Sequence, residues 1–210
     1  MRRIILAIFA LPAFVGAGSA QAMDIANHDY LAARYALRGK ADYGNPHGDV
    51  TGLGLEASRA LGDQVFLRLN SDLYDVDLDG PGSRTALDRF TVGPGIGIPL
   101  NTRMPVELWG ELDYARLSVG GTAADGFGAH VGLRAQFAER FSGGVTLQTA
   151  NTDAGRRDFD YEAYTLDLAY QINPRVDLTV SLVNGTIKRN GNASDIDLDN
   201  VLQLGVRLPF

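Results

Sequence analysis

The stretch "VLQLGVRLPF" (residues 201–210) alternates between two faces of an extended chain. Every second residue from Leu202 to Phe210 is apolar, whereas the residues between them include Gln203 and Arg207. A two-residue period is the pattern of a β-strand with one face in apolar surroundings. We therefore expect a strand here, with its other face turned toward a polar environment.

The same alternation recurs through the rest of the chain. In "VFLRLNSDL" (65–73), Leu67 and Leu69 fall on one face, and Arg68 and Asn70 fall on the other. Ten such segments can be recognised, at 30–43, 49–61, 64–76, 86–100, 105–118, 126–137, 141–150, 159–172, 175–185 and 197–210. Short connections at 62–63, 101–104, 138–140 and 173–174 alternate with longer polar ones at about 44–48, 77–85, 119–125, 151–158 and 186–196. Their residue types are those of turns and loops.

A water-soluble antiparallel sandwich would also alternate, so the two architectures must be separated by other features. The polar face carries too many ionisable side chains for a sandwich core, whereas the apolar face is nearly free of charge. The polar-face set includes Arg34, Arg38, Lys40, Glu56, Arg68, Asp72, Arg89, Glu107, Glu111, Arg134 and Asp177. Segments of about 10–14 residues can also cross a membrane at a tilt of about 45°. These features favour a membrane barrel.

Two further features agree with this choice. Alternating short and long connections are typical of outer-membrane barrels, in which periplasmic turns are short and outer loops are longer. Aromatic residues also gather at segment ends, as in the girdles at the two membrane interfaces. One predicted girdle contains Tyr30, Phe137, Phe141, Tyr170 and Phe210, and the other contains Tyr43, Tyr114, Phe127 and Tyr164.

The sequence thus predicts an all-β fold, a closed antiparallel up-and-down transmembrane β-barrel. Ten strands fit the pattern, and eight remain the alternative if the hairpin containing 141–150 is misjudged. An even number places both ends of the barrel on the periplasmic side. Pro94 cannot donate a hydrogen bond to a neighbouring strand, so "GPGIGIP" (93–99) is expected to hold a bulge or bend.

The first residues of the chain and its composition give information on its cellular location and on the partners that it can have. Arg2 and Arg3, the apolar run 4–15 and the small residues Ala20 and Ala22 predict a cleaved secretory signal over 1–22, followed by a single barrel domain over 23–210. The formal net charge of −6 disfavours nucleic-acid binding. The absence of cysteine excludes disulfides and thiolate chemistry.

The predicted signal, the alternating strands and the ending "LGVRLPF" together resemble small Gram-negative outer-membrane β-barrel proteins, the OmpA-transmembrane-domain/OmpX-like class. In that class the barrel-assembly machinery reads a C-terminal strand that ends in phenylalanine. Leu204, Val206, Leu208 and Phe210 match that pattern. The resemblance implies a location in the cell outer membrane, contact with lipid and lipopolysaccharide, and assembly through the strand ending at Phe210. It implies no particular activity.

The stretch "DVDLDG" (75–80) begins like a calcium-binding loop, with Asp75, Asp77 and Asp79. The twelfth position of such a loop needs an acidic residue, and Ala86 occupies it. The three aspartates continue the outward-facing positions of Leu67 and Leu69, so we expect them at the outer rim, beyond the hydrocarbon. A weak contact with divalent cations is the alternative. "DIDLDN" (195–200) repeats the pattern.

His130 is predicted to face the lumen, where Glu111, Asp113 and Asp72 are within reach. A histidine–aspartate pair could activate water, but a hydrogen-bonded network is the simpler interpretation. We therefore expect no catalytic, cofactor-binding or metal-ligating residues and no enzymatic activity. Arginines facing carboxylates would form an ion-paired plug. The predicted role is structural or surface interaction with an unidentified ligand, with a narrow channel and a barrel-embedded hydrolase as alternatives.

Overall fold

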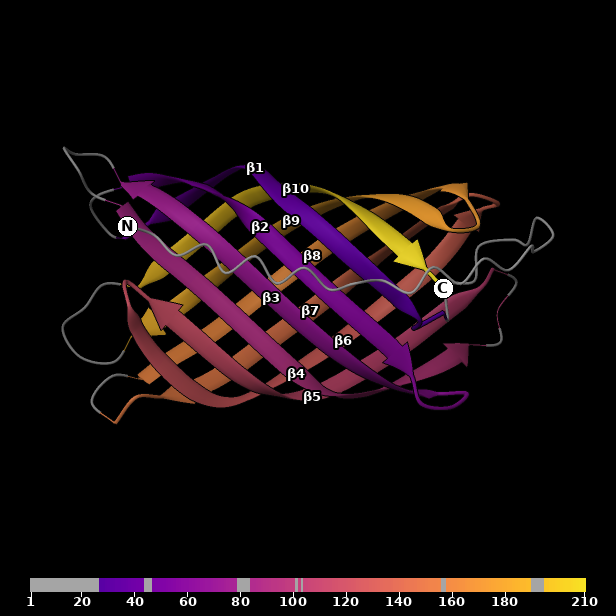
Figure 1. Ribbon diagram of the computed structural model, residues 1–210, viewed down its shortest axis with the longest axis horizontal. Coiled ribbons are helices and arrows are strands. Elements are labelled where there is room, and N and C mark those ends of the chain that lie inside the picture. The colour runs from indigo at the N-terminus through magenta and orange to yellow at the C-terminus, as the bar shows by residue number, and fades with distance from the viewer. Residues whose placement is uncertain are drawn as a thin grey trace.

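The computed structural model describes residues 27–43, 47–78, 84–100, 102, 104–155, 158–189 and 195–210. The predicted signal at 1–22 and Asp79 lie outside the described residues. Within the described part, ten antiparallel strands form a closed barrel in which β1 pairs with β10 (Figure 1). The strands are β1 (Tyr30–Asp42), β2 (His47–Ala60), β3 (Val65–Leu78), β4 (Arg84–Leu100), β5 (Val106–Val119), β6 (Thr122–Ala138), β7 (Phe141–Asp153), β8 (Asp158–Asn173), β9 (Val176–Arg189) and β10 (Ile196–Pro209).

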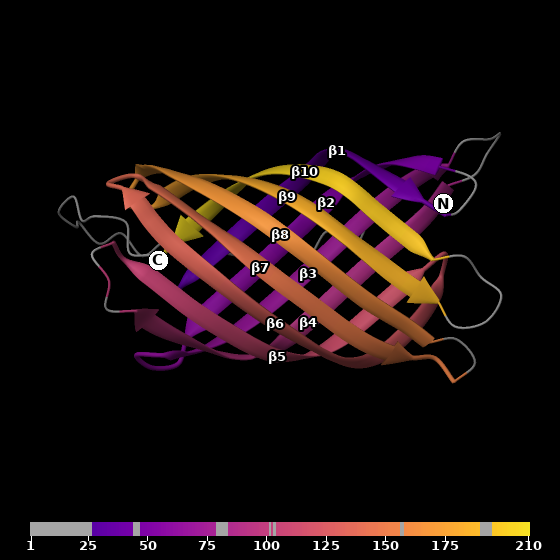
Figure 2. The same cartoon turned by 180° about the vertical axis from the view of Figure 1, so that it is seen from behind.

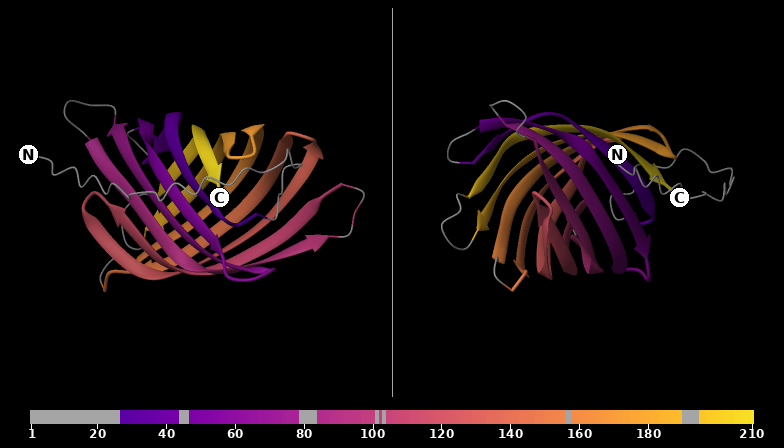
Figure 3. Two further views of the ribbon diagram at one scale, coloured as in Figure 1. Left: turned by 45° about the vertical axis from the view of Figure 1, so that its right-hand side comes forward. Right: turned by 60° about the vertical axis from the view of Figure 1, so that its left-hand side comes forward.

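The prediction of ten strands is confirmed. The segment 141–150, which was the weakest of the ten in the sequence, forms most of β7 and pairs along its length with both β6 and β8. The views from behind and from the sides show the same continuous sheet (Figures 2 and 3). No helix of the described residues is long and apolar enough to cross a membrane.

A belt of exposed apolar side chains surrounds the outside of the barrel. Its members alternate with buried polar residues along each strand, and they include Leu55, Leu67, Leu108, Val131, Leu166 and Leu204. On β6 the belt runs from Phe127 to Phe137, both exposed. Ten residue steps of about 3.3 Å at a tilt of about 40° give a height of about 25 Å, which matches the apolar band of outer-membrane barrels. The chain is a transmembrane β-barrel of the outer-membrane type.

The two ends of the barrel differ. We call the end where β1 starts and β10 finishes the terminal end, and the opposite end the loop end. The aromatic residues Phe137, Phe141 and Tyr170 pack together at the terminal end, with ring centroids 6.2 and 4.9 Å apart. Tyr114 and Phe127 lie exposed and opposite each other toward the loop end. The predicted girdles therefore form, except that Tyr30 and Tyr43 point elsewhere, Tyr30 being buried in the lumen.

Beyond Tyr114 and Phe127, toward the loop end, the polarity of the two faces reverses. The inward side chains there are apolar, and the outward side chains are polar. On β3, Val76 is completely buried inside the barrel, whereas Asp77 is exposed and pairs with Arg84. On β10, Ile196 is completely buried and Asp197 is exposed. Polar residues point outward here because the strands have left the lipid and are surrounded by water. The outward placement predicted for the aspartates of "DVDLDG" is confirmed for Asp77.

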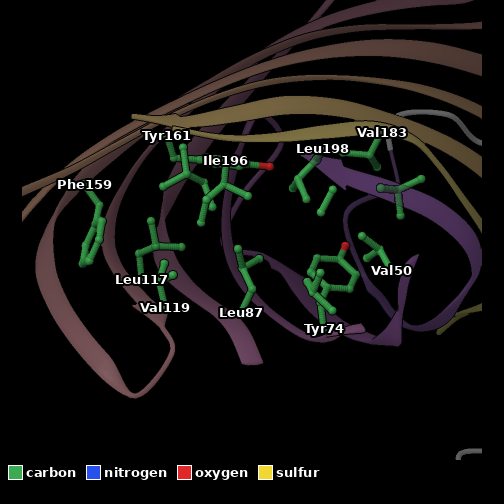
Figure 4. Close-up of a cluster of buried hydrophobic side chains, with 14 of the residues drawn as sticks. Val50, Tyr74, Leu87, Leu117, Val119, Phe159, Tyr161, Val183, Ile196 and Leu198 are labelled. Carbon is green, nitrogen blue, oxygen red and sulfur yellow. The ribbon is translucent and has the colours of Figure 1, made fainter. Parts of the chain in front are cut away.

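The inward side chains at the loop end form an apolar cluster to which all ten strands contribute (Figure 4). We call this cluster the loop-end core. It consists of Ala36, Ala41, Val50, Tyr74, Val76, Leu87, Ala115, Leu117, Val119, Ala124, Ala150, Phe159, Tyr161, Val183, Ile187, Ile196, Leu198 and Val201. In Figure 4 the labelled side chains point from the surrounding strands toward one another across the interior.

The placement of Arg38 and Lys40 on the lumen face was wrong. Pairing between β1 and β10 shifts register between Ala36 and Arg38 and again between Arg38 and Lys40. A bulge of this kind adds residues to one strand and reverses which residues face inward. Arg38 is consequently exposed, and Lys40 reaches Asp49 on the outside of the barrel, 2.7 Å away.

A bulge or bend was predicted near Pro94, and the register of β4 contains no bulge there. β4 and β5 keep one register from Val92–Tyr114 to Gly95–Glu111, and only Gly93 and Pro94 are missing from their ladder. Pro94 still pairs in register with Leu67 of β3. The missing N–H thus interrupts the β4–β5 ladder locally without bending the strand out of register.

The connections at the loop end are shorter than predicted because the strands themselves extend beyond the belt. The predicted loop 119–125 is a two-residue turn of Gly120 and Gly121 between β5 and β6. Both glycines have positive φ angles, 58° and 85°, as the tightest hairpin turns require. Residues predicted as outer loop therefore belong largely to the strands that surround the loop-end core.

Candidate functional site

The candidate site is the barrel interior, which is divided into layers along its axis. The loop-end core fills one end. Ion pairs and a cavity occupy the middle. Aromatic rings and a histidine occupy the terminal end on the side of β3, β4 and β5.

His28, which precedes β1, folds back into the lumen at the terminal end. Its ring stacks on Phe66 with a centroid distance of 3.9 Å and an interplanar angle of 8°. Its Nε2 atom lies 2.9 Å from Oε1 of Glu107, and the residue is only 5% exposed. Trp109 packs edge-on against Phe66, 6.4 Å away. Sequence reasoning missed this layer because His28 lies outside the alternating pattern.

Glycines on neighbouring strands make room for these rings. A Cβ atom at Gly95 would lie 2.2 Å from Cζ of Phe66, and one at Gly132 would lie 2.4 Å from Cε2 of Trp109. Both distances are far below van der Waals contact. Gly95 and Gly132 therefore relieve crowding between the lumen rings and the neighbouring strands.

Arginine–carboxylate pairs occupy the lumen between the terminal end and the loop-end core, as predicted. Arg34 reaches Glu56 at 2.9 Å, Arg89 reaches Asp72 at 2.5 Å, and Arg207 reaches Asp177 at 2.7 Å, with all these side chains at most 17% exposed. Arg68 lies 3.5 Å from Glu56 and 3.3 Å from Glu111, and its guanidinium stacks over the Trp109 ring at 4.3 Å. Breaking any one pair would leave a buried charge without a partner, which is costly.

A cavity of about 120 Å³ lies beside these pairs. Arg34 and Arg68 line one wall, whereas the wall formed by β7, β8 and β9 carries small residues such as Gly144, Thr146 and Ser181. The space is large enough for several water molecules among polar partners. The cavity is suited to water or small ions, and it ends where the loop-end core begins.

The structure brings three predicted neighbours together. Oxygen and nitrogen atoms of Glu111, Asp113 and His130 lie within 4.8 Å of one another, and His130 Nε2 is 3.4 Å from Asp113 Oδ2. Asp72, also expected there, pairs with Arg89 instead. His47 is exposed at the loop end beside Asp42. Chemically, the three-residue cluster offers two carboxylates and an imidazole, which could exchange a proton or coordinate a cation.

The chain has low sequence identity to the outer-membrane proteins of known structure named below. No family model matches the chain, and no curated protein matches it. Neisserial surface protein A is 18% identical over 86% of this chain and 96% of its own, with a TM-score of 0.47. An outer-membrane channel from Pseudomonas putida F1 is 11% identical over 94% and 100%, with a TM-score of 0.49. Outer-membrane protein OprG from Pseudomonas aeruginosa is 10% identical over 89% and 99%, with a TM-score of 0.37.

Proposed function

We propose that this protein is a non-conducting outer-membrane barrel whose role is structural or is performed by its outward-facing rim. The observation that carries the proposal is the loop-end core. Side chains from all ten strands meet there, and Val50, Val76, Ile187 and Ile196 have no exposed surface. An apolar constriction that excludes water also excludes hydrated ions, because nothing in it replaces their hydration shell.

The outer surface of the loop end offers a contact region for lipopolysaccharide. Exposed pairs ring this level, formed by Lys40 with Asp49, Arg84 with Asp77, Arg116 with Asp125 and Lys188 with Glu162. Their cations lie just above the apolar belt, at the height where lipid phosphates would be. Lipopolysaccharide headgroups are therefore the partner that we propose for this rim.

The closure of the barrel supports assembly through the last strand. β10 pairs with β1 from Tyr30–Pro209 to Asp42–Asp197, and Phe210 is 59% exposed at the terminal end. Recognition of this strand by the barrel-assembly machinery is part of the proposal. So is membership of the OmpA-transmembrane-domain/OmpX-like class, although ten strands exceed the roughly eight of that class. The proposal includes no catalytic activity.

Planar-bilayer recording tests the proposal. The purified protein is expected to insert without producing conductance steps, while a porin added to the same membrane produces them and shows that the assay works. Reproducible steps from the protein alone, with an amplitude that rises with salt concentration, would contradict the non-conducting role.

The second candidate is a narrow channel for ions or very small solutes, and the polar cavity favours it. Conduction would require the loop-end core to open, because the cavity ends there. Steps that disappear when Arg68, which lines the cavity, is replaced by Met would identify the cavity as the path and establish the channel in place of the closed barrel.

A further inference from the structure

We infer that Glu111, Asp113 and His130 bind a single divalent transition-metal ion inside the lumen. Glu111 and Asp113 are two residues apart on β5, so both point inward. His130 lies directly opposite Glu111 in the pairing of β5 with β6. The cross-strand arrangement therefore brings two carboxylates and one imidazole to one place, with their donor atoms within 4.8 Å of one another.

The two carboxylates are buried and lack hydrogen bonds. The Glu111 side chain is 1% exposed and that of Asp113 is 0% exposed. Among the described residues, no donor makes a hydrogen bond to any of their four oxygens. Arg68 Nη1 lies 3.3 Å from Glu111 Oε2, and Nε2 of the His130 imidazole, which is charged only when protonated, lies 3.4 Å from Asp113 Oδ2. Two adjacent buried carboxylates in this state are stabilised by a further positive charge, which protons or a bound cation can supply.

Two other buried lumen acids, Asp72 and Asp177, differ in this respect. Asp72 accepts hydrogen bonds from Nε and Nη2 of Arg89, at 3.1 and 2.5 Å. Asp177 accepts one from Nε of Arg207 at 2.8 Å. Each of these acids therefore has an arginine placed to neutralise it. Unlike these two acids, Glu111 and Asp113 accept no hydrogen bond from an arginine, so an added cation is favoured beside them.

Two glycines make room for the Asp113 side chain. A Cβ atom at Gly128, which lies opposite Asp113 on β6, would be 2.5 Å from Asp113 Oδ1. A Cβ atom at Gly93 would be 2.7 Å from Asp113 Cβ. His130 also lines the central cavity, which gives an ion a route to the cluster. The Asp113 side chain is therefore accommodated by the two glycines, and the cluster adjoins the central cavity through His130.

The donor set selects the class of metal. Calcium and magnesium prefer sites made only of oxygen, whereas an imidazole together with carboxylates suits zinc and its first-row neighbours. Zinc with three protein ligands keeps a fourth position for water, at ligand distances of about 2.0–2.2 Å. A tetrahedral site with bonds of that length holds its donor atoms about 3.3 Å apart. The donor atoms of the three side chains lie within 4.8 Å of one another, so side-chain rotations that bring them closer would complete the site.

Calorimetric titration with Zn²⁺ tests the inference on the chelator-treated barrel in detergent, and Co²⁺ absorption provides a spectroscopic readout. We expect one ion per chain, with ligand-field bands of a four-coordinate Co²⁺ site. Glu111→Gln, Asp113→Asn and His130→Gln should each lower the affinity for Zn²⁺ at least about tenfold. Removing a hydrogen-bonding partner of a metal ligand already lowers affinity by about 10- to 100-fold, and removing a ligand itself should cost at least as much. If one variant does not fold, the other two still decide the matter.

Two matched controls locate the ion. Asp177→Asn removes a buried lumen carboxylate outside the cluster, and Asp77→Asn removes a rim carboxylate. Both should bind Zn²⁺ as the wild type does. Absence of saturable binding by the wild type would overturn the inference. Unchanged affinity in the three cluster variants would also overturn it, and a loss in Asp77→Asn alone would assign the metal to the rim.

Discussion

Arginine substitutions at two outward positions of β6 test where the lipid ends. Val131 and Ala123 both point outward, four residues to either side of the exposed girdle residue Phe127. Four steps of about 3.3 Å at a tilt of about 40° place each position about 10 Å from the level of Phe127 along the barrel axis. Val131 then lies near the middle of the apolar belt, and Ala123 lies in water beside the loop-end core.

The two substitutions should therefore have different costs. Val131→Arg places a guanidinium near the bilayer midplane, which lowers the free energy of unfolding by about 2–4 kcal/mol, or roughly 30- to 700-fold in the folding equilibrium. Ala123→Arg places the same group in water next to an existing charged rim. Its effect should stay within about 0.5 kcal/mol, as for ordinary surface substitutions.

Reversible urea unfolding in phospholipid vesicles measures both free energies under one set of conditions. The same strand, the same outward face and the same introduced residue make the pair a matched comparison. Equal costs at the two positions, or a larger cost for Ala123→Arg, would refute the assignment of the membrane boundary and of the reversed pattern beyond it.

Three other substitutions test packing and charge inside the barrel. Ile187→Ala in the loop-end core should lower the free energy of unfolding by about 2–5 kcal/mol, and a loss below about 1 kcal/mol in urea titration would show that the core is loosely packed. Arg207→Met should cost about 3–5 kcal/mol because Asp177 is left buried without its partner, and adding Asp177→Leu should recover much of that loss. Gly93→Ala would set a Cβ atom 2.1 Å from the Leu112 carbonyl oxygen, so a cost of at least about 1–3 kcal/mol is expected from the same titration, and a neutral effect would contradict the close approach of β4 and β5.

The strand count was predictable because lipid imposes a strict rule on every crossing segment. A residue such as Leu67 must face outward and its neighbour Arg68 must not, so the period of two is kept through each belt crossing. Even the ambiguous segment 141–150 follows this rule. Sequence alternation is therefore a strong signal of fold wherever one face meets hydrocarbon.

Local irregularities were not predictable from the same signal. The bulges in β1 reverse the faces of Arg38 and Lys40, but the sequence continues to alternate through them, so nothing marks the shift. His28 was missed for a related reason. Its position depends on contacts with Phe66 and Glu107, which lie on other strands, and no periodicity in its own segment reports them.

The sequence indicated the outward-facing residues around the loop-end core but not the inward-facing residues that form it. The aspartates of "DVDLDG" indicated that polar side chains point outward at the end of β3, and Asp77 does so. The converse, that Val76 then faces an apolar interior, depends on what the other nine strands place opposite it. Val50, Ile187 and Ile196 come from distant parts of the chain, so only the closed barrel shows that they meet.

Thiol accessibility at neighbouring positions of "DVDLDG" tests most directly whether this core seals the lumen. The chain has no cysteine, so Val76→Cys and Asp77→Cys each introduce a single thiol, the first in a completely buried position and the second in an exposed one. A small water-soluble maleimide should modify the Asp77→Cys thiol at least about a hundredfold faster, since the buried thiol reacts only through rare opening of the core. Equal rates at the two positions would mean that water fills the mouth of the barrel and that the lumen is open at its outer end.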